Sequence, residues 1–524
     1  MIISYLRYFP SKDDFRPLNI IMRKYFLISD SVVFLSKFLH VIRDMLIAVV
    51  LGTSQFADAF FGISRLLSLI TSLFANGIFS ALFSPIFLQL LREGRNSALQ
   101  FSHEIQLILA FIGIVIFTVA EIFTEKILFC LMPGMLSSPV RDSLITTAKI
   151  AFPSILFIPL TSLYYSMVHT RRNFALITPY TIITNTALTA VILFTGNNST
   201  LLLPNMGCTI AFSGMIQMLL FLHQLEKSDL IPVLIQFSLS KNIKNFFKCF
   251  LPSALASEAY QINILVSIYF ASKIPQAISS LCYAEGIIQL FFVLTNTSLL
   301  EISGSSSIMF THNAEELKKT QNKALKKVIT ACIPVTIMLI FMPEHITASL
   351  FLLGGKFDIQ SVKHTTHMLE ILAFALPAHA LKKGFLQPFL AFDKLKAPVS
   401  FTVASVVLNA ITSIILVPHY SYTGIAIALC AAAWLDTLLI IVYLKRRKMF
   451  SSDGKIPRLL STVFFPASIT IFFIQICEAF IESHPGISTI YSLRLASLVI
   501  VCISSIFIYY FLLSQLKKIP WKKK

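Results

Sequence analysis

The sequence predicts an all-α, polytopic membrane protein with about 14 transmembrane helices, arranged as two six-helix lobes around a central cavity plus two C-terminal helices. Three observations predict this fold class: the composition, the number of apolar runs and an internal repeat. Of the 524 residues, 56% are hydrophobic and 13% are charged, and the mean hydropathy is +0.78. A soluble domain keeps a charged surface. The chain is therefore expected to be integral to a membrane.

The apolar runs give the helix count. Each is long enough to cross about 30 Å of hydrocarbon. Two of them, 59–90 and 277–309, exceed one span, so we expect these helices to tilt, bend or extend beyond the membrane. The runs lie at 27–50, 59–90, 103–128, 147–169, 175–196, 201–224, 246–272, 277–309, 327–351, 365–391, 397–418, 421–444, 459–482 and 488–515.

The connections between these runs are alternately rich and poor in Lys and Arg, as the positive-inside rule requires. Both termini are therefore assigned to the cytoplasm. The net charge of +18 falls in short connections and not on a basic face with interleaved aromatic residues, which argues against nucleic-acid binding. The predicted organisation is a cytoplasmic tail at 1–26, a first lobe at 27–224, a cytoplasmic linker at 225–245, a second lobe at 246–444, a cytoplasmic loop at 445–458, two further helices at 459–515 and a basic cytoplasmic tail at 516–524.

An internal repeat relates the two predicted lobes. Pro153 and Pro377 open similar apolar runs 377 − 153 = 224 residues apart, and Asn185 and Asn409 have the same offset, 409 − 185 = 224. Gly207 and Gly424 then open a further pair of similar runs. Repeats of this kind are a recurring transporter architecture.

Four ionisable residues lie in the first apolar run, "SKFLHVIRDMLIAVVLG": Lys37, His40, Arg43 and Asp44. On a helix that advances about 100° per residue, Lys37, His40 and Asp44 share a face. Two interpretations stay open. The cluster could fix helix packing, because buried charges are often paired structurally, or it could bind an anion on a cavity wall, because cations outnumber the acid and Arg65 follows on the next helix.

In the second predicted lobe the balance of charge reverses. Glu258 and Glu285 are each followed by a glutamine within about one turn. Glu285 could be a proton or cation site, or could pair with Lys37 or Arg43 when the cavity is closed. Lys382 and Lys383 are expected near the cytoplasmic side, where long side chains can reach the interface.

No catalytic or metal-binding constellation emerges. The sequence has no phosphate-binding glycine loop, no paired-aspartate metal motif and no Ser/His/Asp set in an extramembrane segment. The eight cysteines are scattered without metal-ligand or redox spacing. Transport is therefore favoured over enzymatic activity. No cofactor is predicted, and a coupling ion or the membrane potential stays open as the energy source.

Residues 36–87 resemble the first two helices of the lipid II flippases, the MurJ (MviN) family of the multidrug/oligosaccharidyl-lipid/polysaccharide exporter superfamily. The features that carry the resemblance are the "SKFLHVIRD" start, the "ADAFF" turn at 57–61 and "FANGIFSALFSP" at 74–85. Weaker likeness continues through "LFLLGGKFD" at 350–358 and "FLAFDKLKAPV" at 389–399. The resemblance implies two lobes around a V-shaped cavity, with the two last helices forming a groove for a lipid tail.

By this resemblance Lys37 stands where the family has an essential arginine, Arg43 matches another, and Asp58 matches an acid after the first helix. The chain also departs from the family. Thr71 and Ser72 occupy the place of a cavity arginine pair, and Asn76 replaces an acid. "YAEGIIQ" places Glu285 and Gly286 where the family usually has Asp-Arg.

The first functional hypothesis is a lipid II flippase in a bacterial cytoplasmic (inner) membrane. It would move an undecaprenyl-pyrophosphate-linked peptidoglycan precursor to the outer leaflet by alternating access. Its expected partners are lipid II, membrane lipids and other proteins of cell-wall synthesis. The alternatives are a related exporter of another polyprenyl-linked glycan or of small organic cations, and a membrane scaffold that has lost transport. The expected substrate-binding residues are Lys37, His40, Arg43, Asp58 and Arg65, and the expected gating residues are Asp44, Glu258 and Glu285.

Overall fold

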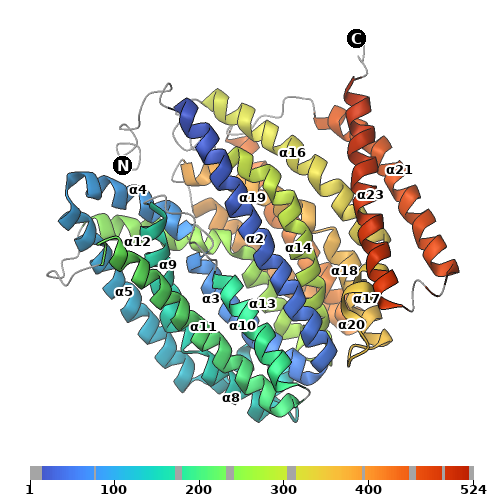
Figure 1. Cartoon of the computed structure of the whole chain (residues 1–524), viewed down its shortest axis with the longest axis horizontal. Helices are drawn as coiled ribbons and strands as arrows, with labels where there is room; N and C mark the ends of the chain where they lie inside the picture. The colour runs from blue at the N-terminus through green and yellow to red at the C-terminus, as the bar shows by residue number, and fades with distance from the viewer. Residues whose placement is uncertain are drawn as a thin grey trace. The chain divides into compact units, whose positions relative to one another are not determined.

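The computed structural model describes residues 15–75, 78–170, 180–196, 198–231, 241–303, 314–391, 396–447, 456–484, 486 and 490–518. All regular structure within these residues is α-helical (Figure 1), which confirms the predicted class. Parts of the predicted organisation lie outside the described residues. These are residues 1–14 of the first tail, 232–240 in the centre of the linker, 448–455 in the loop before α21, and 519–524 of the last tail.

The chain divides into two compact units, which do not follow the order of the sequence. Unit 1 comprises 1–43, 55–275 and 392–406, and unit 2 comprises 44–54, 276–391 and 407–524. Helix α2 (Phe15–Leu51) therefore contributes to both units. The other helices of unit 1 are α3 (Gln55–Ala75), α4 (Ile78–Glu93), α5 (Arg95–Ile122), α6 (Thr124–Leu131), α7 (Pro133–Leu136), α8 (Arg141–Ala151), α9 (Ser154–Thr170), α10 (Tyr180–Thr195), α11 (Ser199–Lys227), α12 (Lys241–Ser257) and α13 (Ala259–Ala271).

Unit 2 contains the end of α2 and most of the later helices. These are α14 (Ala277–Ser303), α16 (Ala314–Phe341), α17 (Pro343–Phe351), α18 (Ile359–Ala373), α19 (Leu376–Ala391), most of α20 (Lys396–Arg446), α21 (Ile456–Ser483) and α23 (Tyr491–Lys518). The predicted lobe boundaries stay a prediction.

Helix α20 is continuous except for a sharp break at Ser421. Its backbone there has φ 49° and ψ −128°, a region that L residues seldom adopt. The break follows Pro418 and divides the helix between the predicted runs 397–418 and 421–444. The two halves double back closely, because a Cβ on Gly424 would lie 2.8 Å from the carbonyl oxygen of Leu416.

Seven helical stretches in the described residues are long and apolar enough to cross a membrane. The number rises to eight if Leu325–Phe341 and Pro343–Phe351, bent by 78°, form one span. The stretch Ala397–Arg446 counts once although it contains two predicted runs, and Thr181–Thr195, Ala259–Ala271 and Ala277–Phe292 are shorter apolar helices. The count of about fourteen spans stays a prediction.

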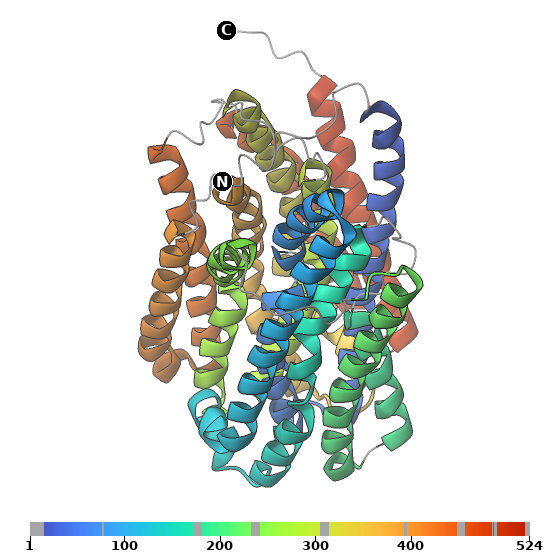
Figure 2. The same ribbon diagram turned by 90° about the vertical axis from the view of Figure 1, so that its left-hand side faces the viewer.

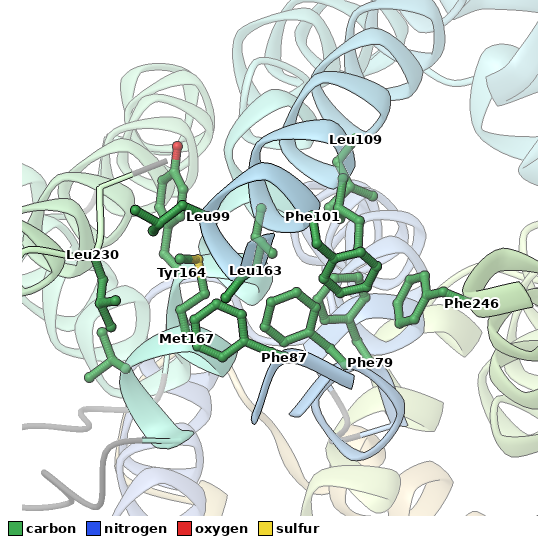
Figure 3. Packing of buried hydrophobic residues seen from close by; sticks show 14 of the residues in the cluster. Phe79, Phe87, Leu99, Phe101, Leu109, Leu163, Tyr164, Met167, Leu230 and Phe246 are labelled. Carbon is green, nitrogen blue, oxygen red and sulfur yellow. The ribbon is translucent and has the colours of Figure 1, made fainter. Parts of the chain in front are cut away.

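A ladder of phenylalanine rings forms the core of unit 1 (Figure 3). Phe79, Phe83 and Phe87 recur every four residues on α4, so their rings stack along one helix face. Phe101 of α5 stacks on Phe83 with ring centroids 5.7 Å apart, and Phe246 of α12 meets Phe79 edge to face at 5.3 Å. Helices α9 and α11 contribute Leu163 and Phe221 to the same core, and α8 and α10 pack against α11 in the teal-to-green part of Figure 2.

The two last helices, α21 and α23, lie side by side (red in Figure 1). Val463, Tyr509 and Leu513 form a small core between them. The α23 helix is fixed to α17, because Ser497 Oγ lies 3.1 Å from His345 Nε2 and the Arg494 guanidinium donates to the carbonyl oxygen of Leu352. Both helices also expose rows of large apolar side chains, among them Phe464, Phe472, Phe480, Ile500, Ile503 and Phe507.

The end of α2 is clasped by the loop that precedes α18. Lys356 N–H donates to the carbonyl oxygen of Val49 at 2.9 Å, and Tyr283 Oη donates to that of Gly52 at 2.8 Å. Gly355 lies so close that a Cβ there would stand 2.5 Å from Cα of Val49. Only a residue without a side chain allows this approach.

Unit 1 contains a second clasp of the same kind. Gly134 of α7 packs on the end of α13, where its N–H donates to Ser272 Oγ at 3.3 Å. A Cβ on Gly134 would lie 2.6 Å from the carbonyl carbon of Ser272. The two glycines are 355 − 134 = 221 residues apart, an offset close to that of the repeat. In both clasps a glycine therefore receives the end of an apolar helix.

Candidate functional site

The candidate site lies on α2 in unit 1, around Arg43. Its Nη1 donates to Asn185 Oδ1 of α10 at 3.0 Å, and its Nη2 donates to His40 Nε2 at 3.4 Å. The guanidinium also stands over the Phe60 ring of α3, 5.9 Å from the ring centroid, a distance at which cation–π attraction operates. Three helices therefore hold one buried arginine.

Two further cations, Lys37 and Arg65, lie near the His40 imidazole. The charges of Arg43, Lys37 and Arg65 all influence His40, so the predicted residues of α2 and α3 do come together. Arg65 is buried, and Lys37 is partly exposed. A cluster of cations with an imidazole can replace the hydration shell of an anion, because charge-assisted hydrogen bonds are the stronger ones.

Asn185 is a site residue whose role the sequence does not reveal. Besides accepting from Arg43, its amide donates to the carbonyl oxygen of Ser36 at 3.4 Å. It therefore joins α10 to two successive turns of α2. The sequence analysis uses Asn185 only to align the two halves of the repeat. The signal that could have identified its role is an amide side chain within an apolar run, in a chain whose first apolar run carries an arginine.

Asp58 and Asp44 are both buried but differ in their setting. Asp58 lies in the first turn of α3, where the helix dipole favours a carboxylate. Asp44 lies at the point where α2 passes from unit 1 to unit 2. The binding role of Asp58 and the gating role of Asp44 stay predictions.

The two predicted acidic gating residues are buried as well. Glu258 occupies the junction between α12 and α13 and accepts from Ser257 Oγ at 3.1 Å. Glu285 of α14 is fully buried and accepts a hydrogen bond from Gln289, one turn later. The predicted pairing of Glu285 with Lys37 or Arg43 stays a prediction.

The hydroxyls that stand in place of the family's arginine pair bond to their own helix. Thr71 Oγ1 donates to the carbonyl oxygen of Leu67, and Ser72 Oγ to that of Leu69, each at 2.9 Å. They supply no charge, so the cations of this site come from Lys37, Arg43 and Arg65. Asn76 lies outside the described residues.

The position of Lys382 near the cytoplasmic side stays a prediction, but the structure gives this lysine a partner that the sequence analysis does not name. Lys382 of α19 is only 9% exposed, and its Nζ lies 2.6 Å from Asp436 Oδ2 of α20. The sequence analysis did not single out Asp436, although an acid within an apolar run is itself a signal. Within the described residues no three His, Cys, Asp or Glu side chains gather as a metal site would require.

Comparison with known proteins places most of the chain in one family. The model of the family described as "Lipid II flippase MurJ" matches residues 47–519. Among curated relatives, the probable lipid II flippase MurJ of Rickettsia prowazekii (strain Madrid E) is 25% identical over 80% of this chain and 83% of its own length. That of Buchnera aphidicola subsp. Baizongia pistaciae is 27% identical over 91% and 94%. The lipid II flippase MurJ of Burkholderia cenocepacia is 24% identical over 79% and 82%.

Solved structures show the same fold. A lipid II flippase MurJ in an inward closed conformation matches with a TM-score of 0.74 at 21% identity, over 92% of this chain and 99% of that one. An inward-facing MATE family transporter of the MOP superfamily matches with a TM-score of 0.59 at 13% identity, over 79% and 94%. With its apolar helices and its match over nearly the full length, this chain is a multi-pass bacterial membrane protein that belongs to the MurJ family of lipid II flippases.

Proposed function

We propose that the chain flips lipid II from the inner to the outer leaflet of a bacterial cytoplasmic membrane by alternating access. The observation that carries this proposal is the group of cations around Arg43 in unit 1. The head group of lipid II contains a pyrophosphate with at least two negative charges. Moving it through a low-dielectric region is prohibitive unless cations and hydrogen-bond donors replace its water.

Each residue of the site has a role in this proposal. Arg43 presents a planar guanidinium already oriented by Asn185 and Phe60, so its ordering is complete before the anion arrives. Lys37 supplies a second point charge. Arg65 supplies a third charge, the neutral His40 ring accepts a hydrogen bond from Arg43, and Asp58 lies in the first turn of α3.

The hydrocarbon tail of the substrate remains in lipid. The exposed apolar rows on α21 and α23 support a role for these two helices as its groove. Both termini are proposed to be cytoplasmic. Reporter fusions after Arg95, Arg172, Lys448 and Lys524 should then report cytoplasm, and fusions near Asn198 and Tyr420 the opposite side.

A membrane potential that is negative inside would assist outward movement by about 2.3 kcal/mol per negative charge per 100 mV. The empty cationic site would be drawn back inward. This cycle needs no nucleotide and no covalent intermediate.

The test is complementation of a conditional lipid II flippase depletion, combined with an assay that reports lipid II in each leaflet. The chain should restore growth together with outward lipid II. The Lys37→Ala/Arg43→Ala variant should insert in the membrane but restore neither. Growth without outward lipid II would overturn the proposal, and parental flipping by the double variant would overturn the cationic mechanism.

A further inference from the structure

A groove between α10 and α11 lies apart from the proposed anion site. The two helices pack side by side in unit 1 (Figure 1). The groove has a volume of about 370 Å³, within the range of about 300–1,000 Å³ that is usual for small-molecule sites. Both helices contribute to its apolar wall, with Ile183, Ala187 and Val191 from α10 and Cys208, Phe212 and Ile216 from α11.

The polar groups in this groove make hydrogen bonds within the protein. Thr209 Oγ1 donates to the carbonyl oxygen of Asn205 at 2.7 Å, and Ser213 Oγ donates to that of Thr209. The Asn205 amide donates to Thr195 Oγ1 at 3.5 Å. The wall therefore offers an occupant mainly methyl and methylene groups, and an occupant gains van der Waals contacts there.

The groove opens toward the hydrocarbon layer of the membrane. The stretch Thr200–Lys227 of α11 is long and apolar enough to cross a membrane, and Thr181–Thr195 of α10 is a shorter apolar helix. Phe194, Phe212 and Ile216, which line the groove, are also exposed large apolar side chains. In a membrane such side chains meet lipid, so the molecules available to fill the groove are the hydrocarbon chains of the bilayer.

The length and direction of the groove fit one leaflet. From Asn205 to Ile216 the groove covers 216 − 205 = 11 residues of α11, which is about 16 Å along a helix. One leaflet is half of a hydrocarbon layer of about 30 Å. The more polar end of the groove, at Thr195 and Asn205, adjoins the connection between α10 and α11. A phospholipid has the same arrangement, with ester groups at the membrane surface and an acyl chain directed inward, whereas an undecaprenyl chain is longer than the groove.

We propose that this groove binds one acyl chain of a phospholipid from the leaflet that adjoins the C-terminal end of α10. The occupant lies behind the helix that orients Arg43. Asn185, the partner of Arg43, is two residues from Ala187, which places the two side chains about 160° apart around α10. A chain seated in the groove therefore supports α10 from the side opposite the proposed anion site.

The first test adds dioleoyl phosphatidylcholine to the full chain in detergent and counts the bound phospholipids by native mass spectrometry. Ala187→Ile/Cys208→Ile narrows the groove with residues that the second half of the repeat already has at the corresponding positions, Ile411 and Ile425 (187 + 224 = 411, 208 + 217 = 425). This double variant should bind one phospholipid fewer than the wild type.

Thr186→Ile is the matched control for the double variant. Thr186 is exposed on α10 at the same depth but does not line the groove. This control should bind as many phospholipids as the wild type. Equal numbers of phospholipids on the wild type and the double variant would overturn the proposal.

A second measurement uses the wild-type chain and does not depend on the folding of a variant. Cys208 lies in the groove, and Cys130 of α6 is exposed elsewhere in unit 1. Added dioleoyl phosphatidylcholine should slow the alkylation of Cys208 by N-ethylmaleimide and leave that of Cys130 unchanged, as peptide mass spectrometry can report. An unchanged rate at Cys208 would contradict the proposal.

Undecaprenyl phosphate is the competing occupant in the same assay. If it protects Cys208 and the phospholipid does not, the groove takes a polyprenyl chain and the proposal is wrong. Neither measurement uses lipid II, so failure of this proposal is distinguishable from failure of the flippase function.

Discussion

Arg43 and Asn185 are joined by a 3.0 Å hydrogen bond between α2 and α10, and this bond predicts separable effects of two substitutions. Asn185→Leu should lower stability by about 1–3 kcal/mol, because it leaves a buried guanidinium donor without its acceptor. Asn185→Asp should keep the protein stable and yet slow flipping, because the new carboxylate competes with an anionic substrate. Thermal unfolding in detergent and leaflet assays measure the two effects. Asn205→Leu, on the exposed side of α11, is the control; equal flipping by Asn185→Asp and wild type would contradict the mechanism.

The charge at position 37 should matter more than its shape. Lys37→Arg should retain flipping, whereas Lys37→Glu should abolish it by placing a negative charge beside the substrate anion. Arg43→Ala should reduce flipping at least about tenfold, the equivalent of about 1.4 kcal/mol, while membrane insertion is unchanged. Leaflet assays on inserted protein provide the measurement. Activity of Lys37→Glu would show that position 37 does not face the anion.

The clasp glycines should not tolerate a methyl group. Gly134→Ala and Gly355→Ala would drive a Cβ into the backbone of Ser272 and Val49, respectively, and overpacking of this kind costs about 1–3 kcal/mol or more. Gly486→Ala is the matched control, since a Cβ there meets no atom within 4 Å. The measurement is the unfolding temperature of each variant, which should fall for Gly134→Ala and Gly355→Ala but not for Gly486→Ala. Equal unfolding temperatures would show that both contacts accommodate a methyl group without strain.

Phe83 should contribute more to stability than any lipid-facing phenylalanine. Its ring is fully buried between those of Phe79, Phe87 and Phe101, so Phe83→Ala should cost about 3–5 kcal/mol. Phe194 is 91% exposed, and Phe194→Ala should have little effect. Denaturant or thermal unfolding in one detergent compares the pair; a similar loss in both would place the core elsewhere.

The Asp358 cap predicts a pH dependence outside the membrane. Hydrogen bonds from the hydroxyl and N–H of Ser361 at the start of α18 hold the pKa of the Asp358 carboxyl below its usual value. The cap therefore stabilises the fold above the unfolded pKa of about 3.9, and its contribution disappears as pH falls through the lower folded value.

Asp358→Ala should accordingly lower stability by about 1 kcal/mol near neutral pH. The difference from wild type should shrink toward pH 3. Asp358→Asn keeps an acceptor oxygen that does not titrate, so it should remove the pH dependence and retain most of the stability. Unfolding temperatures across this range test the cap, and a constant difference between wild type and Asp358→Ala would contradict it.

The sequence predicts the helical class well because a helix that crosses a membrane requires a long apolar run, which is visible in the sequence itself. It places Lys37, His40, Arg43 and Arg65 correctly as a group, since helical spacing and adjacent helices fix their approximate positions. It misses Asn185 and Asp436 because each acquires its role from a residue far along the chain, Arg43 and Lys382. The ion pair of Lys382 could not be predicted for the same reason, because a sequence does not show which acid a buried lysine meets.

The clasp between the end of α2 and Gly355 has a consequence for synthesis. Val49 leaves the ribosome 355 − 49 = 306 residues before its partner, which at about 5–20 residues per second is roughly 15–60 s. The end of α13 meets Gly134 in the opposite order, with the glycine made first. The end of α2 therefore has no contact with this loop during most of translation. Unit 2 reaches its final packing only when the ribosome has passed the middle of the chain.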